Sequence, residues 1–120
     1  LRSVEADVVD ICLPTDLHTA AALKAIKAGK HIFCEKPLAL RLPDAVKIRD
    51  AAKAAGVSGQ VGQCIRFWPE YLAFREFLES GRAGALRSLT LQRRSMLPTH
   101  SVGHWLLDPK RSGGAALDLH

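Results

Sequence analysis

The sequence predicts an α/β fold built on a parallel sheet. Three runs rich in β-branched and apolar residues, at Asp7–Leu13, His31–Cys34 and Val57–Phe67, alternate with two alanine-rich helix patterns. The connections are short, so each helix must carry the chain back to begin the next strand in the same direction. The order strand, helix, strand, helix, strand therefore predicts three adjacent parallel strands joined by right-handed crossovers.

Both helices show an apolar stripe and a stop signal. We expect them to run over Asp16–Ala28 and Pro43–Ala55, with Gly29 and Gly56 as the residues that end them. The stripes have helical spacing and consist of Thr19, Ala22, Leu23 and Ile26 in the first helix, and of Ala45, Ile48, Ala52 and Ala55 in the second. The strand at Asp7–Leu13 carries valine and isoleucine on both faces, which predicts a strand that is buried on both sides.

The pattern changes after Phe67, where we place a domain boundary. Pro69–Ser80 reads as a helix, and its aromatic residues are expected in a core rather than on a cofactor: Tyr71, Phe74 and Phe77. Ala85–Arg94 alternates apolar and polar residues, which predicts a strand with one wet face. Ser95–Ser112 reads as a polar loop, and a helix opened by Ser112-Gly113-Gly114 follows. The expected domains are thus residues 1–67 and 68–120.

Composition excludes several classes of protein. The 120 residues are 48% hydrophobic, enough for a core, and the net charge of +5 is spread along the chain. Without a basic stripe that carries aromatic residues, nucleic-acid binding is not expected. No run approaches the roughly 20 apolar residues of a membrane span, so no membrane contact is expected either.

The cysteines argue against a metal site. Cys12, Cys34 and Cys64 each lie in a predicted strand, and their number is odd. They form no C-x-x-C pair and show no metal-site spacing with the five histidines, so we expect no metal. Buried, reduced thiols of a cytoplasmic protein are the simpler interpretation.

Polar groups follow the ends of two successive strands. Pro14-Thr15-Asp16-Leu17-His18 comes after the first strand, and Cys34-Glu35-Lys36-Pro37 closes the second. The carboxyl ends of parallel strands meet at one edge of the sheet, and ligands bind there. Lys36 is therefore either a functional cation or a surface lysine at a strand end.

The motifs of this chain, in the order in which they occur, resemble those of the Gfo/Idh/MocA oxidoreductases, the family of glucose–fructose oxidoreductase and inositol dehydrogenase. The resemblance spans nearly the whole chain. It rests on Asp7 to Thr15 with His18, Gly29 to Leu38, Val61-Gly62-Gln63, Arg66-Phe67 with Pro69, and Ser112 to Asp118.

The resemblance implies a Rossmann domain that runs into an α+β substrate domain, and NAD(P)-dependent hydride transfer at a hydroxyl-bearing carbon of a sugar or polyol. It implies a catalytic role for Lys36, which would hydrogen-bond the reacting hydroxyl, and a cis Lys36–Pro37 bond. Asp118 matches the family's aspartate. The family's histidine, four residues later, would be residue 122 and lies beyond this sequence.

Five further positions are cofactor candidates, with Lys36 as a sixth, and most have a structural alternative. Pro14 and Thr15 end the first strand, where Thr15 could contact a cofactor, cap the helix, or do both. His18 could contact a ligand or only cap and pack. Glu35 could orient Lys36, meet a ribose, or be a solvated charge. Gln63, expected on the third strand, could contact the cofactor or pair within the sheet.

The substrate-determining region is less defined. Arg66 could be structural or could face the substrate. Arg93-Arg94, His100, His104 and Trp105 lie where the family varies with substrate.

The leading hypothesis is thus an internal part of a cytoplasmic, homo-oligomeric dehydrogenase that uses NAD or NADP on a sugar or polyol. We expect the isolated 120 residues to lack activity, because the family's glycine-rich phosphate loop would precede residue 1. One alternative is a non-catalytic dinucleotide-binding sensor or partner-binding module. Another is an imine-reducing relative such as biliverdin reductase.

Overall fold

The computed structural model describes residues 5–92, 94–96 and 98–118, which fall into two compact units. The first unit comprises residues 1–62 and 98–120, and the second comprises residues 63–97. The assignment of domains to 1–67 and 68–120 stays a prediction.

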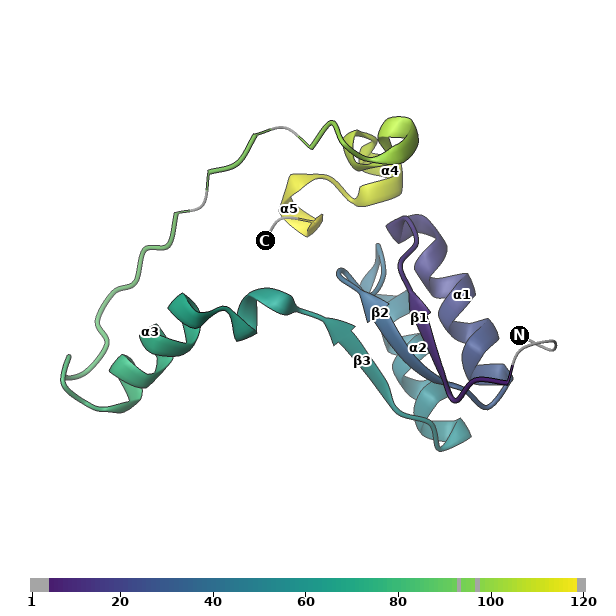
Figure 1. Cartoon of the computed structure of the whole chain (residues 1–120), viewed down its shortest axis with the longest axis horizontal. Helices are drawn as coiled ribbons and strands as arrows, with labels where there is room; N and C mark the ends of the chain where they lie inside the picture. The colour runs from purple at the N-terminus through teal and green to yellow at the C-terminus, as the bar shows by residue number, and fades with distance from the viewer. Residues whose placement is uncertain (1–4, 93, 97, 119–120) are drawn as a thin grey trace. The chain divides into compact units, whose positions relative to one another are not determined.

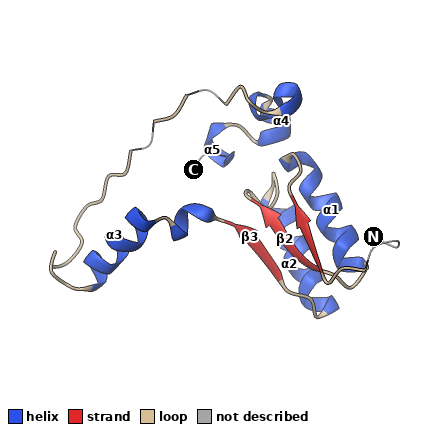
Figure 2. Ribbon diagram, viewed as in Figure 1, coloured by secondary structure: helices blue, strands red, loops and turns tan. Residues whose placement is uncertain are grey.

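The first unit contains a parallel sheet in the order β1-β2-β3 (Figure 1, Figure 2). Its strands are β1 (Val8–Ile11), β2 (His31–Glu35) and β3 (Gly59–Gly62), joined by α1 (Thr15–Lys27) and α2 (Leu42–Ala55). β1 and β2 are thus each followed by a helix that returns the chain to the same end of the sheet. The predicted parallel α/β topology is confirmed.

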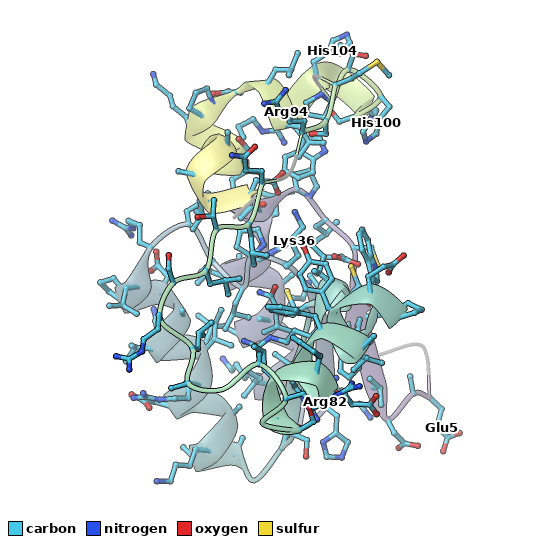
Figure 3. The ribbon with its side chains drawn as sticks, turned by 90° about the vertical axis from the view of Figure 1, so that its left-hand side faces the viewer. Glu5, Lys36, Arg82, Arg94, His100 and His104 are labelled. Atoms are coloured by element: carbon cyan, nitrogen blue, oxygen red, sulfur yellow. The ribbon has the colours of Figure 1, made fainter. Side chains whose placement is uncertain are left out.

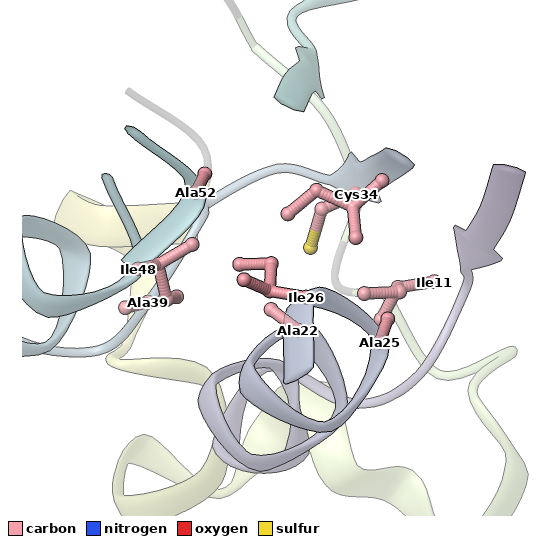
Figure 4. Packing of buried hydrophobic residues seen from close by; sticks show 9 residues of the cluster. Ile11, Ala22, Ala25, Ile26, Cys34, Ala39, Ile48 and Ala52 are labelled. Atoms are coloured by element: carbon pink, nitrogen blue, oxygen red, sulfur yellow. The ribbon is translucent and has the colours of Figure 1, made fainter. Parts of the chain in front are cut away.

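The core lies between one face of the sheet and both helices (Figure 4). Ile11, Ile32 and Cys34 point to this side and are buried. The helices contribute mainly small residues, which let their backbones approach the sheet closely; the buried apolar ones are Ala22, Ala25, Ile26, Ile48 and Ala52.

The opposite face of the sheet differs from the prediction. On β1, Val8 is 52% exposed and Asp10 is exposed as well, so β1 is not buried on both sides; Phe33 on β2 is 37% exposed. The physical reason is that α1 and α2 pack on the same face, as consecutive right-handed crossovers require.

Glycines end the two helices as predicted. Gly56 is the C-cap of α2 with φ of 65°, and Gly29 follows the C-cap of α1 with φ of 69°. Both lie in the left-handed region, which costs other residues energy. Pro14 precedes α1 as its N-cap residue, and Thr15 is already helical, so the prediction of Thr15 as a side-chain cap is wrong.

The third predicted strand is shorter than expected. β3 ends at Gly62, and a 3₁₀ helix follows at Cys64–Phe67 (η1), so Gln63 is not on the strand. Gly62 pairs with Glu35, the last residue of β2, and beyond that point β3 has no strand to pair with.

Of the three cysteines, only Cys34 is buried, and all three are free.

The second unit is built around α3 (Pro69–Glu79), close to the predicted helix. Trp68 and Tyr71 meet edge to face at 6.3 Å between ring centroids, and the Arg82 guanidinium lies 5.3 Å from the centre of the Phe77 ring. The expected strand Ala85–Arg94 is not formed in its described residues, which carry no regular structure.

Residues 98–118 belong to the first unit and contain more helix than the predicted loop. A 3₁₀ segment spans Val102–Leu107 (η2), and α4 (Pro109–Ser112) follows it directly. The helix expected after the two glycines is present as α5 (Ala115–Asp118).

Candidate functional site

A pocket of about 360 Å³ lies at the carboxyl ends of β1 and β2. The β1 end contributes Cys12, Leu13 and Pro14, and the β2 end contributes Glu35 and Lys36. This is the edge at which open parallel sheets bind ligands, and the volume lies within the usual range for small-molecule sites. The predicted convergence of the two strand ends is therefore observed.

The rest of the pocket comes from the C-terminal segment of the chain. Its lining residues there are Pro98, His100, Trp105, Leu106 and Asp118. Figure 3 labels Lys36 and His100, which line the same pocket although they are distant in sequence. The first unit thus forms the whole pocket without residues from the second.

A defined series of contacts brings this segment to the strand ends. In α4, Arg111 forms an ion pair with Asp16 in the first turn of α1, with 3.2 Å between Nε and Oδ2. Ser112 is fully buried, and its hydroxyl donates to the Asp108 carbonyl and accepts from the Gly114 N–H. Gly113 and Gly114, with φ of 82° and 76°, then turn the chain into α5.

This turn places Asp118 against Lys36. Lys36 Nζ lies 3.0 Å from Asp118 Oδ1 and also donates to the backbone oxygen of Asp118. The Lys36 side chain is 34% exposed and that of Asp118 is 10% exposed. The two residues named as catalytic from the sequence, 82 positions apart, thus form one ion pair at the pocket wall.

The loop after β2 fixes the backbone of this lysine. The Lys36 N–H donates to Glu35 Oε2 at 3.2 Å, and the Lys36–Pro37 peptide bond is cis, as the resemblance implied. Glu35 is exposed and lines the pocket beside Lys36. Its carboxylate is available both to orient the lysine backbone and to accept a hydrogen bond from a ligand hydroxyl.

Thr15 and His18 lie in the first turn of α1, are each 1% exposed and do not line the pocket. The His18 ring spans two backbone carbonyl oxygens, with Nδ1 2.8 Å from that of Pro37 and Nε2 2.7 Å from that of Leu13. The structure therefore shows a packing role for His18. Thr15 Oγ has no hydrogen-bond partner within the described residues, so the first turn of α1 holds an unmet polar group next to Pro14, which lines the pocket.

The pocket thiol is not an activated nucleophile. The Asp10 carboxylate accepts a hydrogen bond from the Cys12 thiol, and this bond raises the pKa of Cys12. Slight burial and the negative charges of Asp10 and Glu35 raise this pKa further. Burial raises the pKa of Cys34 to about 11, and Glu35 adds to the shift. Both thiols stay protonated at neutral pH, whereas catalytic cysteines are thiolates.

Four of the predicted site residues line this pocket: Pro14, Glu35, Lys36 and Asp118. Thr15 and His18 are buried in the first turn of α1, and Gln63 is the first residue of the second unit; none of the three lines the pocket. Sequence reasoning did not select Cys12 and Leu13, although they adjoin Pro14 at the strand end. It placed His100 and Trp105 only in a region that varies with substrate, and it did not select Pro98 or Leu106 for the site.

The described residues provide neither a metal site nor a membrane-spanning helix. No three side chains from histidine, cysteine, aspartate and glutamate gather there in a way that would hold a metal ion. None of the helices in the described part of the chain has the length and apolar character needed to cross a membrane.

Known proteins resemble this chain in sequence. The family model described as an oxidoreductase family with an NAD-binding Rossmann fold, Gfo/Idh/MocA, matches residues 1–63. The 1,5-anhydro-D-fructose reductase of Ensifer adhaerens is 36% identical over 115 residues, which are 96% of this chain and 34% of that protein. The inositol 2-dehydrogenase of Rhizobium meliloti is 34% identical over 120 residues, 98% of this chain and 34% of that protein.

Solved structures resemble the fold as well. The WlbA dehydrogenase of Bordetella pertussis, crystallised in complex with NADH and UDP-GlcNAcA, aligns with a TM-score of 0.66 and 30% identity, over 69% of this chain and 24% of its own. The chain spans about a third of the length of the curated relatives that it matches. With its parallel sheet, strand-end pocket and family match, the chain belongs to the Gfo/Idh/MocA oxidoreductases, which have an NAD-binding Rossmann fold.

Proposed function

We propose that the protein containing this chain transfers a hydride between NAD or NADP and a secondary alcohol carbon of a sugar or polyol. The observation that carries the proposal is the Lys36–Asp118 ion pair at the wall of a strand-end pocket. The names of the relatives support it, because they include a reductase of a sugar derivative and dehydrogenases of inositol.

Lys36 is the group that meets the reacting oxygen. Alcohol oxidation increases negative charge on this oxygen, and an ammonium held beside it stabilises that charge. Asp118 holds the ammonium in place through its carboxylate and its backbone oxygen. About a third of the Lys36 side chain stays exposed, so the ammonium remains open to a ligand while it is paired.

The residues around the pocket suit a nicotinamide cofactor. Such a cofactor supplies the hydride acceptor or donor. Glu35 offers a carboxylate to ribose hydroxyls, and Pro14 forms the wall at the end of β1. The Thr15 hydroxyl, which has no hydrogen-bond partner among the described residues, and the first turn of α1 follow directly after Pro14 and add polar groups at this strand end. Contact of His18 and Gln63 with the cofactor, the cytoplasmic location and the homo-oligomeric state remain predictions of the sequence.

The test is turnover by the protein that contains this chain, with NAD and NADP each offered with a panel of polyols, inositols and sugars. We expect reduction of one of the two cofactors by at least one of these alcohols. Lys36→Met keeps the length of the side chain and removes its charge. It should lower kcat by about 10² to 10³ and leave cofactor affinity nearly unchanged.

Lys24→Met is the matched control, because Lys24 is an exposed lysine in the last turn of α1 and should have almost no effect. A protein that binds the cofactor but turns over none of the panel would favour the non-catalytic dinucleotide-binding module. Near-normal turnover in Lys36→Met would make Lys36 a structural residue and end the mechanism proposed here.

A further inference from the structure

We propose that His18 is a positioning residue that acts through Lys36, a role that rests on the function proposed above. His18 is 1% exposed and is not among the residues that line the pocket. Its ring instead contacts two backbone segments at the pocket, that of Leu13 after β1 and that of Pro37 after β2.

The geometry of this bridge is two-sided. Nε2 lies 2.7 Å from the carbonyl oxygen of Leu13, and Nδ1 lies 2.8 Å from that of Pro37. A carbonyl oxygen only accepts hydrogen bonds, so a ring N–H at either nitrogen donates to the carbonyl that it faces. A single side chain in the first turn of α1 thereby links the two loops that follow the paired ends of β1 and β2.

Lys36 depends on the second of these bonds. Pro37, whose carbonyl oxygen faces the His18 ring, directly follows Lys36, and the Lys36 N–H donates to the Glu35 carboxylate. On the other side of Lys36, Asp118 holds the ammonium. His18 therefore holds the backbone next to Lys36, and Asp118 holds the ammonium group of Lys36.

Three substitutions separate the two halves of the bridge. His18→Phe keeps a ring of similar size and removes both nitrogens. His18→Asn keeps an amide N–H near the position of Nδ1, so it can still donate to Pro37. His18→Gln places its amide near the position of Nε2, so it can donate to Leu13 but not to Pro37.

The expected kinetic result is a fall in kcat of about 10-fold to 10²-fold in His18→Phe, because displacement of a catalytic group by about 1 Å has effects of this size. His18→Gln should lose nearly as much, and His18→Asn should retain most of the activity. In a Lys36→Met background, His18→Phe should change the remaining kcat by less than about twofold. The same loss in both backgrounds would show a general structural effect and overturn the proposal.

Crystal structures of the variants give a readout that needs no turnover. In His18→Asn the Lys36 Nζ to Asp118 Oδ1 distance should stay near 3.0 Å, and in His18→Gln the ion pair should open. The pair of Asn and Gln variants decides the matter if His18→Phe does not fold. An intact ion pair in His18→Gln would overturn the positioning role even if Lys36 proves catalytic, whereas failure of the proposed function alone would leave this structural result in place.

Discussion

Cys34 is the residue whose surroundings most clearly change its chemistry. It lies on β2, fully buried against both helices, and burial next to Glu35 raises the pKa of its thiol from the usual 9.0 to about 11. In the unfolded chain the thiol would release its proton near its ordinary pKa. Between these two pKa values the folded state binds more protons than the unfolded state, so stability falls as pH rises through that window.

We therefore predict that the free energy of unfolding drops by roughly 1 to 2 kcal/mol between about pH 8 and about pH 10.5 because of this thiol alone. Urea unfolding at the two pH values measures the drop. Cys34→Ala should be less stable at both pH values but should lose less between them. Cys64→Ala, which removes an exposed thiol, is the control. Equal drops in Cys34→Ala and the wild type would contradict the prediction.

Among the elements, the Gly113-Gly114 turn is the one on which the site depends most. It lies between α4, which the Arg111–Asp16 ion pair ties to α1, and α5, which carries Asp118. Gly113 has a φ of 82°, and a Cβ at this position would overlap Leu117 Cδ2 and approach Leu117 Cβ to 3.0 Å. A side chain here meets both backbone strain and a steric clash.

Gly113→Ala should lower the free energy of unfolding by about 1 to 3 kcal/mol and should also lower kcat, because α5 must shift and Asp118 moves with it. Gly29→Ala has a similar φ of 69° with nothing within 4 Å, so it controls for backbone strain and should leave kcat unchanged. Adding Leu117→Ala to Gly113→Ala removes part of the clash and should restore part of both losses. Thermal unfolding and turnover of the four proteins decide the outcome.

The elements that sequence could predict are those with local signals. Apolar periodicity and terminal glycines predicted α1 and α2 to within a residue or two. The alternating run Ala85–Arg94 has the right residues for a strand, but a strand needs a partner, and the described residues 85–92 and 94 have none. In contrast, α4 had a signal that the prediction overlooked: Asp108 caps its first turn by accepting from the Lys110 N–H, and Pro109 follows at the first helical position.

The same distinction applies to the site. Pro14, Glu35 and Lys36 follow from the rule that strand ends converge, and the structure places all three at one pocket. Asp118 came only from the family resemblance, because no local pattern connects it to Lys36. His100 and Trp105 reach the pocket through packing of the C-terminal segment on the strand ends. Tertiary contacts of this kind leave no periodicity in the sequence.

At the scale of the whole chain, regular structure is distributed unevenly. The first unit has a sheet covered by two helices, whereas residues 85–92 of the second unit have neither helix nor strand and are exposed. Leu86, Leu89 and Leu91 show this most clearly, with 57%, 47% and 64% of their surface exposed. Proteases cleave extended, accessible segments directly, while a helix must first open locally.

We predict that brief treatment of the 120-residue chain with trypsin cleaves after Arg87 at least about tenfold faster than after Lys27, because Lys27 ends the packed helix α1. Mass spectrometry of the earliest products measures both rates, and the expected first product is residues 1–87. Arg87→Gln should move the first cut to Arg82 or Arg94 and leave cleavage of α1 as slow as before. Early cleavage after Lys24 or Lys27 would instead mean that the parallel sheet and its helices do not hold together in the 120 residues alone.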